Sequence, residues 1–269
     1  MFEQFRIPPD SKFKIKDIDP DTTDGWKGDK EKAVDKLAEL RAELADLQEV
    51  LYAEHKQKVL IVLQAMDTGG KDGTIRAVFE GVNPQGIQVA SFKVPTPIEA
   101  DHDYLWRVHA RAPGKGELVI FNRSHYEEVL VVRVHGWASM DQTKLRYKSI
   151  RDFERMLVEE GTTIVKFFLH ISRDEQRERL LERIDTPKKQ WKFSSGDLKE
   201  RAYWDDYMAA FEDAIRETST EKAPWYVVPA NRNWYRNLIV ASVIVDTLRG
   251  LKMKYPEPEA DIASFKSQL

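Results

Sequence analysis

Five short apolar segments constrain the fold of this chain more than any other feature, because none of them alternates with polar residues. They are "KVLIVLQAMD", "GIQVASFKV", "GELVIF", "TTIVKFFLHIS" and "PWYVVPA". A strand that is buried on both faces reads as a continuous apolar run, as in parallel sheets covered by helices. Helical stretches separate the segments and can serve as crossovers between parallel strands. We therefore predict an α/β protein with a doubly wound, parallel sheet of five strands and helices on both faces.

A glycine-rich loop follows the first apolar segment, within "LQAMDTGGKDGTIRAVFEG" at residues 63–81. Gly69, Gly70 and Gly73 allow backbone N–H groups to turn inward and approach phosphate oxygens. Lys71 adds a full positive charge, and a helix that we expect to begin near Thr74 adds the partial charge of its N-terminus. An ordinary strand-to-helix turn is the alternative. The combination of strand, glycines, lysine and helix favours phosphate binding.

Two residues depart from the common P-loop pattern and leave a metal ion without its usual hydroxyl ligand. Ala65 stands where that pattern begins with Gly, and Asp72 stands where it has Ser or Thr. Asp67 ends the first strand, on the side where doubly wound sheets bind ligands. A carboxylate buried there is costly by itself but is stabilised beside Lys71 and Mg²⁺. We predict that Asp67 is a metal ligand, with a hydrogen-bonded turn Asp as the alternative.

A second group of polar residues ends the third strand, in "VIFNRSHYEEVLVVRVHG" at residues 119–136. Nucleoside-triphosphate enzymes commonly place an Asp there to complete magnesium coordination. Here Asn122 occupies that position, Arg123 follows it, and Glu127 lies five residues further on, in an expected helix. Taken alone, this segment would indicate only a capped helix with a solvated Arg.

The segment at residues 173–208 is the most charged part of the chain and follows the fourth predicted strand. Arg177, Arg179 and Arg183 recur in it, and "PKKQWKF" adds three lysines around Trp191. Most charge runs are solvated helix faces. In a chain with a phosphate loop, this position also fits a mobile lid that closes arginine over transferring phosphates, which is our prediction.

Composition excludes several classes of function. The chain has no cysteine, which excludes disulfides and thiolate chemistry, and its six histidines lack the spacing of a metal site. Residues 1–58 hold 11 Lys+Arg and 14 Asp+Glu of the totals of 42 and 45, so the remainder is neutral and nucleic acid is not expected as a partner. No stretch approaches the roughly 20 apolar residues that span a bilayer. We expect a cytoplasmic protein that does not bind membranes.

The N-terminal part is predicted to differ from the rest, which divides the chain into residues 1–57 and 58–269. Residues 1–29 lack a sustained period and are interpreted as an extended surface arm. Leucines at 37, 40, 44, 47 and 51 then form one stripe of a helix over residues 29–55. The stripe packs either on its own domain or on a second subunit.

Together, three stretches resemble the family-2 polyphosphate kinases, which are P-loop enzymes that move phosphoryl groups between inorganic polyphosphate and nucleotides. The stretches are "AMDTGGKDGTI", "FNRSHYEEVLVVRVHG" and "RLLERIDTPKKQWKFSSGDLKERAYWDDY", and the resemblance extends from about Asp24 to Lys252. It implies a three-layer α/β/α P-loop kinase-like fold with a helical lid, a Mg²⁺-dependent reaction and a channel for the polyphosphate chain. It also favours a homo-oligomer, a dimer or a tetramer.

Carried over by position, the resemblance assigns Asp67 and Lys71 to the first phosphate-binding motif, Arg123 to the second and Arg183 to the lid. Asn122 stands where many members carry Asp. This change resembles the subgroup that phosphorylates both nucleoside mono- and diphosphates, in which an acidic residue appears at the position of Glu127. The full set predicted to contact phosphate is Gly69, Gly70, Lys71, Asp72, Gly73, Thr74, Arg123, Arg133 and Arg183.

The function expected from the sequence is Mg²⁺-dependent phosphoryl transfer from polyphosphate to AMP and ADP, and the reverse, with other nucleotides as further acceptors. Asp67, Lys71, Arg123 and Arg183 are the predicted catalytic residues, and Asp67 and Glu127 the predicted metal ligands. An ATP-dependent P-loop kinase of nucleotides or small molecules is one alternative. A nucleotide-binding scaffold or regulator without enzymatic activity is another.

Overall fold

A six-stranded sheet forms the centre of the computed structural model, which describes residues 2–260, 262 and 265–266. Its strands are β1 (Arg6–Ile7), β2 (Lys58–Ala65), β3 (Ile87–Ser91), β4 (Leu118–Asn122), β5 (Thr162–His170) and β6 (Trp225–Pro229). Their order is β1-β6-β5-β2-β4-β3, and β2 to β6 pair in parallel. The five predicted parallel strands are therefore confirmed, while the predicted total of five is wrong by one.

The sixth strand comes from the segment that we interpreted as a surface arm. Arg6–Ile7 pairs antiparallel with β6, and the Ser219 hydroxyl donates to the Ile7 carbonyl. Phe5, Ile7 and Ile15 are buried. The surface interpretation is thus wrong for these residues. Each buried piece is only two or three residues long, which is too short to produce a recognisable period in the sequence.

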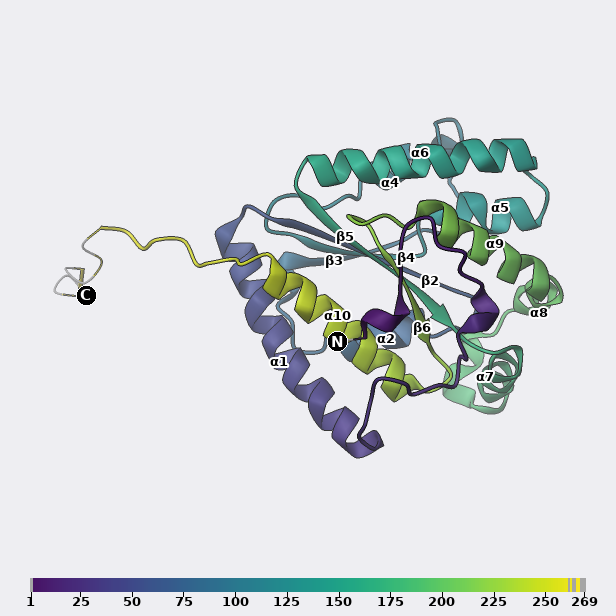
Figure 1. Cartoon of the computed structure of the whole chain (residues 1–269), viewed down its shortest axis with the longest axis horizontal. Helices are drawn as coiled ribbons and strands as arrows, with labels where there is room; N and C mark the ends of the chain where they lie inside the picture. Colours follow the sequence, from purple (N-terminus) through teal and green to yellow (C-terminus); the bar gives the residue numbers. More distant parts are fainter. Residues whose placement is uncertain (1, 261, 263–264, 267–269) are drawn as a thin grey trace.

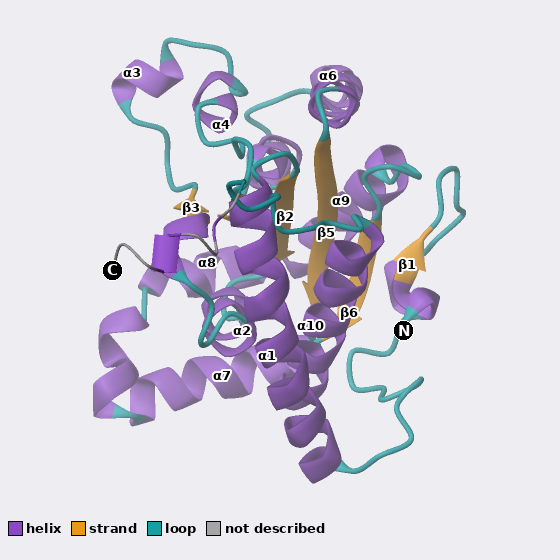
Figure 2. Cartoon of the chain, turned by 90° about the vertical axis from the view of Figure 1, so that its left-hand side faces the viewer, coloured by secondary structure: helices purple, strands orange, loops and turns teal. Residues whose placement is uncertain are grey.

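Helices cover both faces of the sheet, as expected for a three-layer α/β/α fold (Figures 1 and 2). The α-helices are α1 (Lys30–Glu54), α2 (Lys71–Val78), α3 (Pro97–Ala100), α4 (Trp106–His109), α5 (Val131–Val134), α6 (Met140–Glu159), α7 (Arg173–Asp185), α8 (Ser195–Ala202), α9 (Trp204–Thr218) and α10 (Asn233–Gly250). The 3₁₀-helices are η1 (Glu3–Phe5), η2 (Ile15–Asp17), η3 (Pro84–Gly86), η4 (His125–Val129) and η5 (Pro187–Lys192). Within the described residues, no helix is long and apolar enough to cross a membrane.

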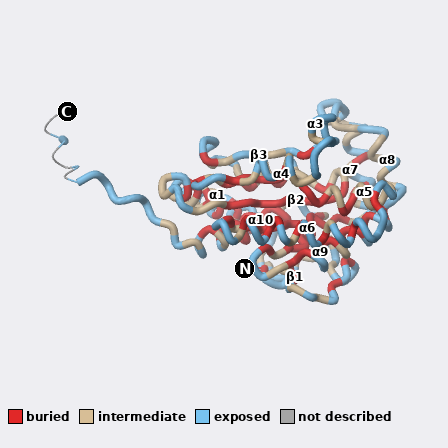
Figure 3. The backbone as a smooth tube through the Cα atoms, turned by 90° about the horizontal axis from the view of Figure 1, so that it is seen from above, coloured by how far each residue is buried: buried red, intermediate tan, exposed pale blue. Residues whose placement is uncertain are grey.

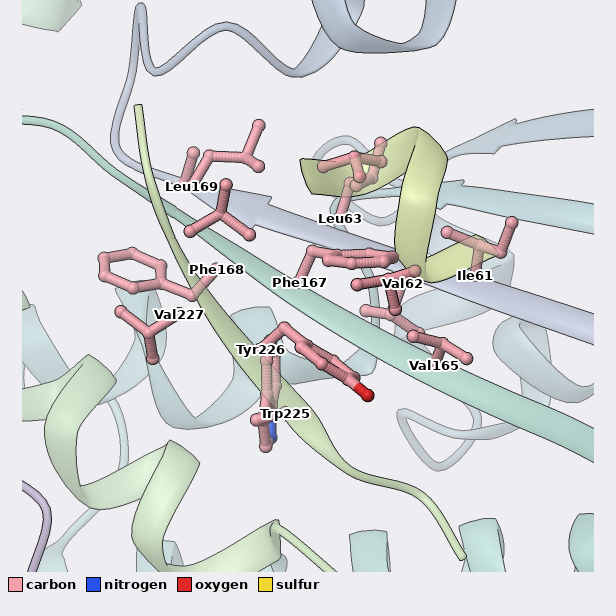
Figure 4. Packing of buried hydrophobic residues seen from close by; sticks show 14 of the residues in the cluster. Ile61, Val62, Leu63, Val165, Phe167, Phe168, Leu169, Trp225, Tyr226 and Val227 are labelled. Carbon is pink, nitrogen blue, oxygen red and sulfur yellow. The ribbon is translucent and has the colours of Figure 1, made fainter. Parts of the chain in front are cut away.

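The sheet is the core of the molecule because its strands are apolar on both sides. Figure 3 shows the buried residues gathered along the strands, and Figure 4 shows side chains of β2, β5 and β6 packed together. Ile61, Phe167 and Val227 are each at most 1% exposed. Helices α2 and α10 pack on one face, and α6 lies on the other with α9 beside it. This rigid core fixes where the carboxyl ends of the strands, and the loops that follow them, are placed.

The leucine stripe of α1 packs against α10 of the same chain. Leu37, Leu40, Leu44 and Leu51 are buried there, and Leu47 packs partly buried against the same core. The helix is confirmed, but its apolar stripe is already covered. The stripe therefore supplies no reason for the chain to associate with a second copy.

A buried polar cluster crosses the core beneath η4. Lys166 of β5 donates from Nζ to Glu154 of α6 at 2.6 Å and to the hydroxyl of Tyr126 at 2.9 Å. The Tyr126 hydroxyl also donates to Glu154, and His125 Nε2 lies 3.2 Å from the same carboxylate. Burial lowers the pKa of Lys166. Burial by itself would raise the pKa of Glu154, but the Lys166 ammonium outweighs it and lowers that pKa. The cluster anchors η4, and hence the segment that follows β4.

Candidate active site

The carboxyl ends of β2, β3 and β4 and the segment after β5 surround a cavity of about 840 Å³. This is the edge of the sheet at which doubly wound folds bind ligands. The cavity brings together most of the predicted site residues, namely Asp67, Gly69, Gly70, Lys71, Asp72, Gly73, Asn122, Arg123 and Arg183. The polar residues that follow strands far apart in the sequence therefore lie together around this cavity.

Lys71 begins α2, three residues before the helix start that we expected near Thr74. Its Nζ donates to the Ala65 carbonyl at 3.0 Å and lies 3.5 Å from the Met66 carbonyl. Loss of solvation, together with the charge of Arg123, lowers the pKa of Lys71 from 10.5 to about 8. The ammonium is thus held against the end of β2, and an anion bound in the cavity would favour its charged form.

Two arginines support the loop from behind and were not assigned this role from the sequence. A Cβ on Gly70, whose φ is +98°, would lie 2.1 Å from Arg236 Nη1. Arg179 donates to the carbonyls of Thr68 at 3.1 Å and Ala230 at 2.6 Å. Burial lowers the pKa of Arg236 to about 9. The signal for Arg236 was a charged residue near the start of a mostly apolar helix, whereas Arg179 was hidden within the charge run.

Arg123 links the ends of β2 and β4. Its φ of +62° lies in the left-handed region, which is uncommon for a residue other than glycine. Its backbone N–H donates to the Leu63 carbonyl at 3.1 Å, and its Nη2 donates to Asp67 Oδ1 at 2.7 Å. Desolvation acts against the charge of Arg123, but the carboxylates of Glu127 and Asp67 prevail and raise its pKa. The guanidinium is therefore held charged at the rim of the cavity.

Asn122 and Asp72 contact each other directly. Asn122 Nδ2 donates to Asp72 Oδ1 at 2.8 Å, and both residues line the main cavity. The N-cap of α2 is Gly70, and no side chain caps that end. Asp72 therefore does not cap the helix; its carboxylate is the partner of the amide that ends β4.

Glu127 faces a second, smaller cavity of about 160 Å³, which it shares with Asp67 and Arg123. It lies on the 3₁₀-helix η4, in agreement with the helix expected at this position. When the side-chain oxygen of Gln64 accepts from Ser124, the amide nitrogen of Gln64 donates to Glu127 Oε1 at 3.1 Å. Loss of solvation and the nearby Asp67 raise the pKa of Glu127, although Arg123 and Lys71 act in the opposite direction.

Asp67 and Glu127 fit the requirements of a magnesium site. Within the described part of the chain, no side-chain cation lies within ion-pair distance of Glu127. Loss of solvation and the nearby Asp67 raise its pKa, and a divalent cation would favour its carboxylate form. Mg²⁺ is usually held by one or two carboxylates together with phosphate oxygens and waters. No group of three or more metal-binding side chains occurs among the described residues, so phosphate oxygens would supply the remaining ligands.

Arg183 reaches the cavity from α7, which lies with η5 and α8 beside the carboxyl ends of the strands and belongs to the segment predicted as a lid (Figure 1). Its Nη1 donates to Asp197 Oδ2 of α8 at 3.1 Å. Burial and the neighbouring Asp67 raise the pKa of Asp197. Arg183 is therefore held at the site by a carboxylate that sequence analysis did not single out. Trp204 and Tyr207, which our lid range included, are buried in α9.

Two residues of the predicted phosphate-binding set lie outside the main cavity lining. Thr74 is buried in α2, where its hydroxyl donates to the Gly70 carbonyl at 3.1 Å. Arg133 donates to the Tyr147 hydroxyl at 3.0 Å and to Asp213 Oδ2 at 2.8 Å. Both side chains are thus engaged within the protein. Contact with phosphate would require these hydrogen bonds to be exchanged.

Comparisons with known proteins agree with this geometry. The family model described as polyphosphate kinase 2 matches residues 27–256. An AMP/ADP-polyphosphate phosphotransferase of Meiothermus ruber is 62% identical over 257 residues, which cover 96% of each chain. An ADP-polyphosphate phosphotransferase of Rhodopseudomonas palustris is 52% identical over 80% of this chain and 78% of its own. The crystal structure of polyphosphate kinase 2 from Arthrobacter aurescens superposes with a TM-score of 0.96 at 47% identity, covering 99% of this chain and 95% of that one.

Proposed function

The chain belongs to the polyphosphate kinase 2 family, and on that premise we propose that it transfers phosphoryl groups from inorganic polyphosphate to AMP and ADP, and in reverse. The observation that carries the proposal is the convergence of Lys71, Arg123 and Arg183 on the main cavity. Three cations at one edge of the sheet suit a reaction in which both substrates are polyanions. The names of the two curated relatives support the choice of donor and acceptors.

The reaction needs alignment and charge neutralisation more than proton transfer. A terminal phosphate oxygen of AMP or ADP attacks the terminal phosphorus of polyphosphate, and the bond from that phosphorus to its bridging oxygen breaks. The nucleotide gains one phosphoryl group and the polymer loses one. Because the second phosphate pKa is about 6, the attacking oxygen is already anionic at pH 7 and requires no general base.

Each charged side chain then has a defined task. Lys71 and Arg123 hold phosphate oxygens at the ends of β2 and β4, and Arg183 adds charge from the lid. Asp67 fixes Arg123 through their hydrogen bond. When bound, Mg²⁺ on Asp67 and Glu127 would neutralise further charge on the phosphate oxygens.

A neighbouring cavity of about 480 Å³ offers room for the rest of the donor chain. It shares Ser91, Phe92 and Lys93 with the main cavity, and it adds Arg107 and Arg111. Arg107 is held by the Lys93 carbonyl at 2.8 Å, whereas Arg111 is exposed. An extended polyanion can follow basic groups from one cavity into the next, which supports polyphosphate over a donor as short as a triphosphate.

The decisive test is to incubate the purified chain with AMP, Mg²⁺ and long-chain polyphosphate, without ATP, and to separate the nucleotides by chromatography. We expect ADP first and ATP later, and no product after EDTA is added. Product only when ATP is the donor would establish the ordinary-kinase alternative. Nucleotide binding without turnover with either donor would establish the scaffold alternative.

We further propose a cytoplasmic homo-oligomer, a dimer or a tetramer, without nucleic acid or membrane as a partner. The cytoplasmic location is supported by AMP and ADP as acceptors and by the absence of cysteine from the chain. Exposed apolar side chains such as Met140 and Leu145 are surfaces that a second copy could cover. Light scattering that gives the 31.2 kDa mass of one chain would contradict the oligomer.

A further inference from the structure

Trp191 combines high exposure with a place in the main cavity. It is 78% exposed, the highest value among the seven tryptophans, and it lines the cavity from η5. The next two, Trp137 at 69% and Trp106 at 46%, each stack on a histidine ring. Within the described residues, no aromatic ring lies against Trp191, and its neighbour is Lys192, whose Nζ is 5.1 Å from the ring centroid.

The turn that presents Trp191 is anchored to the phosphate-binding part of the site. Arg183 Nη1 lies 3.4 Å from the Lys192 carbonyl, next to its hydrogen bond with Asp197. Gln190 Nε2 donates to the Ile184 carbonyl at 2.8 Å, which holds η5 on the end of α7. The turn that carries Trp191 and the side chain of Arg183 are therefore held next to each other at the cavity.

We propose that Trp191 binds the base of the acceptor nucleotide by stacking. The proposal rests on the proposed function, because it takes AMP and ADP as the acceptors. Polyphosphate has no apolar part, whereas each nucleotide carries a planar base at the end opposite its reacting phosphate. Phe92, the other aromatic residue of the cavity lining, is 6% exposed and is covered by Phe121 and Arg107. Trp191 is therefore the aromatic side chain with a free face in this cavity.

Stacking also defines which bases the site accepts. An aromatic ring attracts the π-face that every base possesses and does not read the hydrogen-bonding edge. Purines bind more tightly than pyrimidines, because their larger rings cover more of the indole. AMP and GMP are thus both acceptors, and CMP and UMP are weaker ones.

The test compares Trp191→Ala, Trp191→Leu and Trp191→Phe with Trp137→Ala, which removes an exposed tryptophan outside the cavity lining. AMP binding is measured by calorimetry in Mg²⁺ without polyphosphate, and KM for AMP and for polyphosphate are measured separately. Thermal unfolding checks that each variant is folded. We expect Trp191→Ala and Trp191→Leu to weaken AMP binding by about tenfold, in the range of base stacking. KM for polyphosphate stays unchanged, and Trp191→Phe and Trp137→Ala stay close to wild type.

Unchanged AMP affinity in Trp191→Ala would overturn the proposal, as would Trp191→Leu binding as well as Trp191→Phe. An equal loss for AMP and polyphosphate would show that Trp191 orders the lid as a whole. Because calorimetry needs no donor, the two proposals fail separately. If Trp191→Ala loses AMP affinity but wild type does not use polyphosphate as a donor, the proposed donor is refuted and the role of Trp191 stands. If wild type uses polyphosphate but Trp191→Ala binds AMP normally, the role of Trp191 is refuted and the proposed function stands.

Discussion

Asn122 donates a hydrogen bond of 2.8 Å to Asp72, so that the amide ending β4 is paired with the carboxylate that follows the loop lysine. These are two of the positions at which the sequence departs from the patterns it resembles. An aspartate at position 122 would set two carboxylates against each other. The two departures therefore depend on each other, and together they place one negative charge at the rim of the cavity.

Asn122→Asp should lower kcat/KM for AMP, because like charges about 4 Å apart repel by about 1 to 4 kcal/mol, depending on their exposure. The swapped variant, Asp72→Asn with Asn122→Asp, keeps both the charge and a hydrogen bond and should recover most of the activity. Steady-state kinetics of the two single variants and the double variant measure this coupling. Additive losses in the double variant would show that the pair does not act as a unit.

The pH dependence of kcat/KM should report Lys71. Its pKa is lowered to about 8, so the ammonium is fully present below that pH and is lost as the pH rises through it. We expect kcat/KM to fall above about pH 8, because this parameter follows the free enzyme. The acceptor phosphate, with a pKa of about 6, is already ionised in that range. A level profile to about pH 9 would contradict the assignment.

Arg183→Ala should lower kcat by about 10²-fold or more, as for other arginines that neutralise a transferring phosphoryl group. Arg177→Ala is the matched control, since Arg177 lies on the same helix but is exposed. Its kcat should match that of wild type. Near-normal kcat in Arg183→Ala would remove this arginine from the site.

Glu154→Gln should destabilise the fold by about 3–5 kcal/mol, because it leaves the buried Lys166 ammonium without its carboxylate. Glu159→Gln, on the same helix, removes only an exposed contact with Arg155 and should cost less than about 1 kcal/mol. Urea unfolding of both variants gives the comparison. Equal losses would mean that the buried pair contributes no more than a surface pair.

The sequence was sufficient to predict the elements with a strong local signal. The runs at β2 and β5 are apolar over most of their length, so burial on both faces was visible in the residue types, and the glycines next to Lys71 marked the loop that lines the cavity. Arg6–Ile7 gave no such signal, because a two-residue strand is specified by its partner β6 and not by a pattern of its own. The assignment of Arg123 and Arg183 came from the resemblance to a family, and both line the cavity.

What the sequence could not provide were contacts between distant segments. The leucine stripe of α1 had to pack against another apolar surface, but only the fold could identify that surface as α10. The same holds for Asp197, which holds Arg183, and for Asn122, whose partner lies fifty positions away on α2. Such pairs are set by how the elements pack in space, which local patterns do not encode.

Transfer of label from polyphosphate tests the central claim most directly. Terminally ³²P-labelled polyphosphate, AMP and Mg²⁺ are incubated with wild type and with Lys71→Met, after circular dichroism has shown that both are folded. We expect label to enter ADP with wild type and almost none with Lys71→Met, because the variant lacks the charge that meets the phosphates at the end of β2. Equal labelling of ADP by both proteins, or no labelling by wild type, would contradict transfer from polyphosphate at this loop.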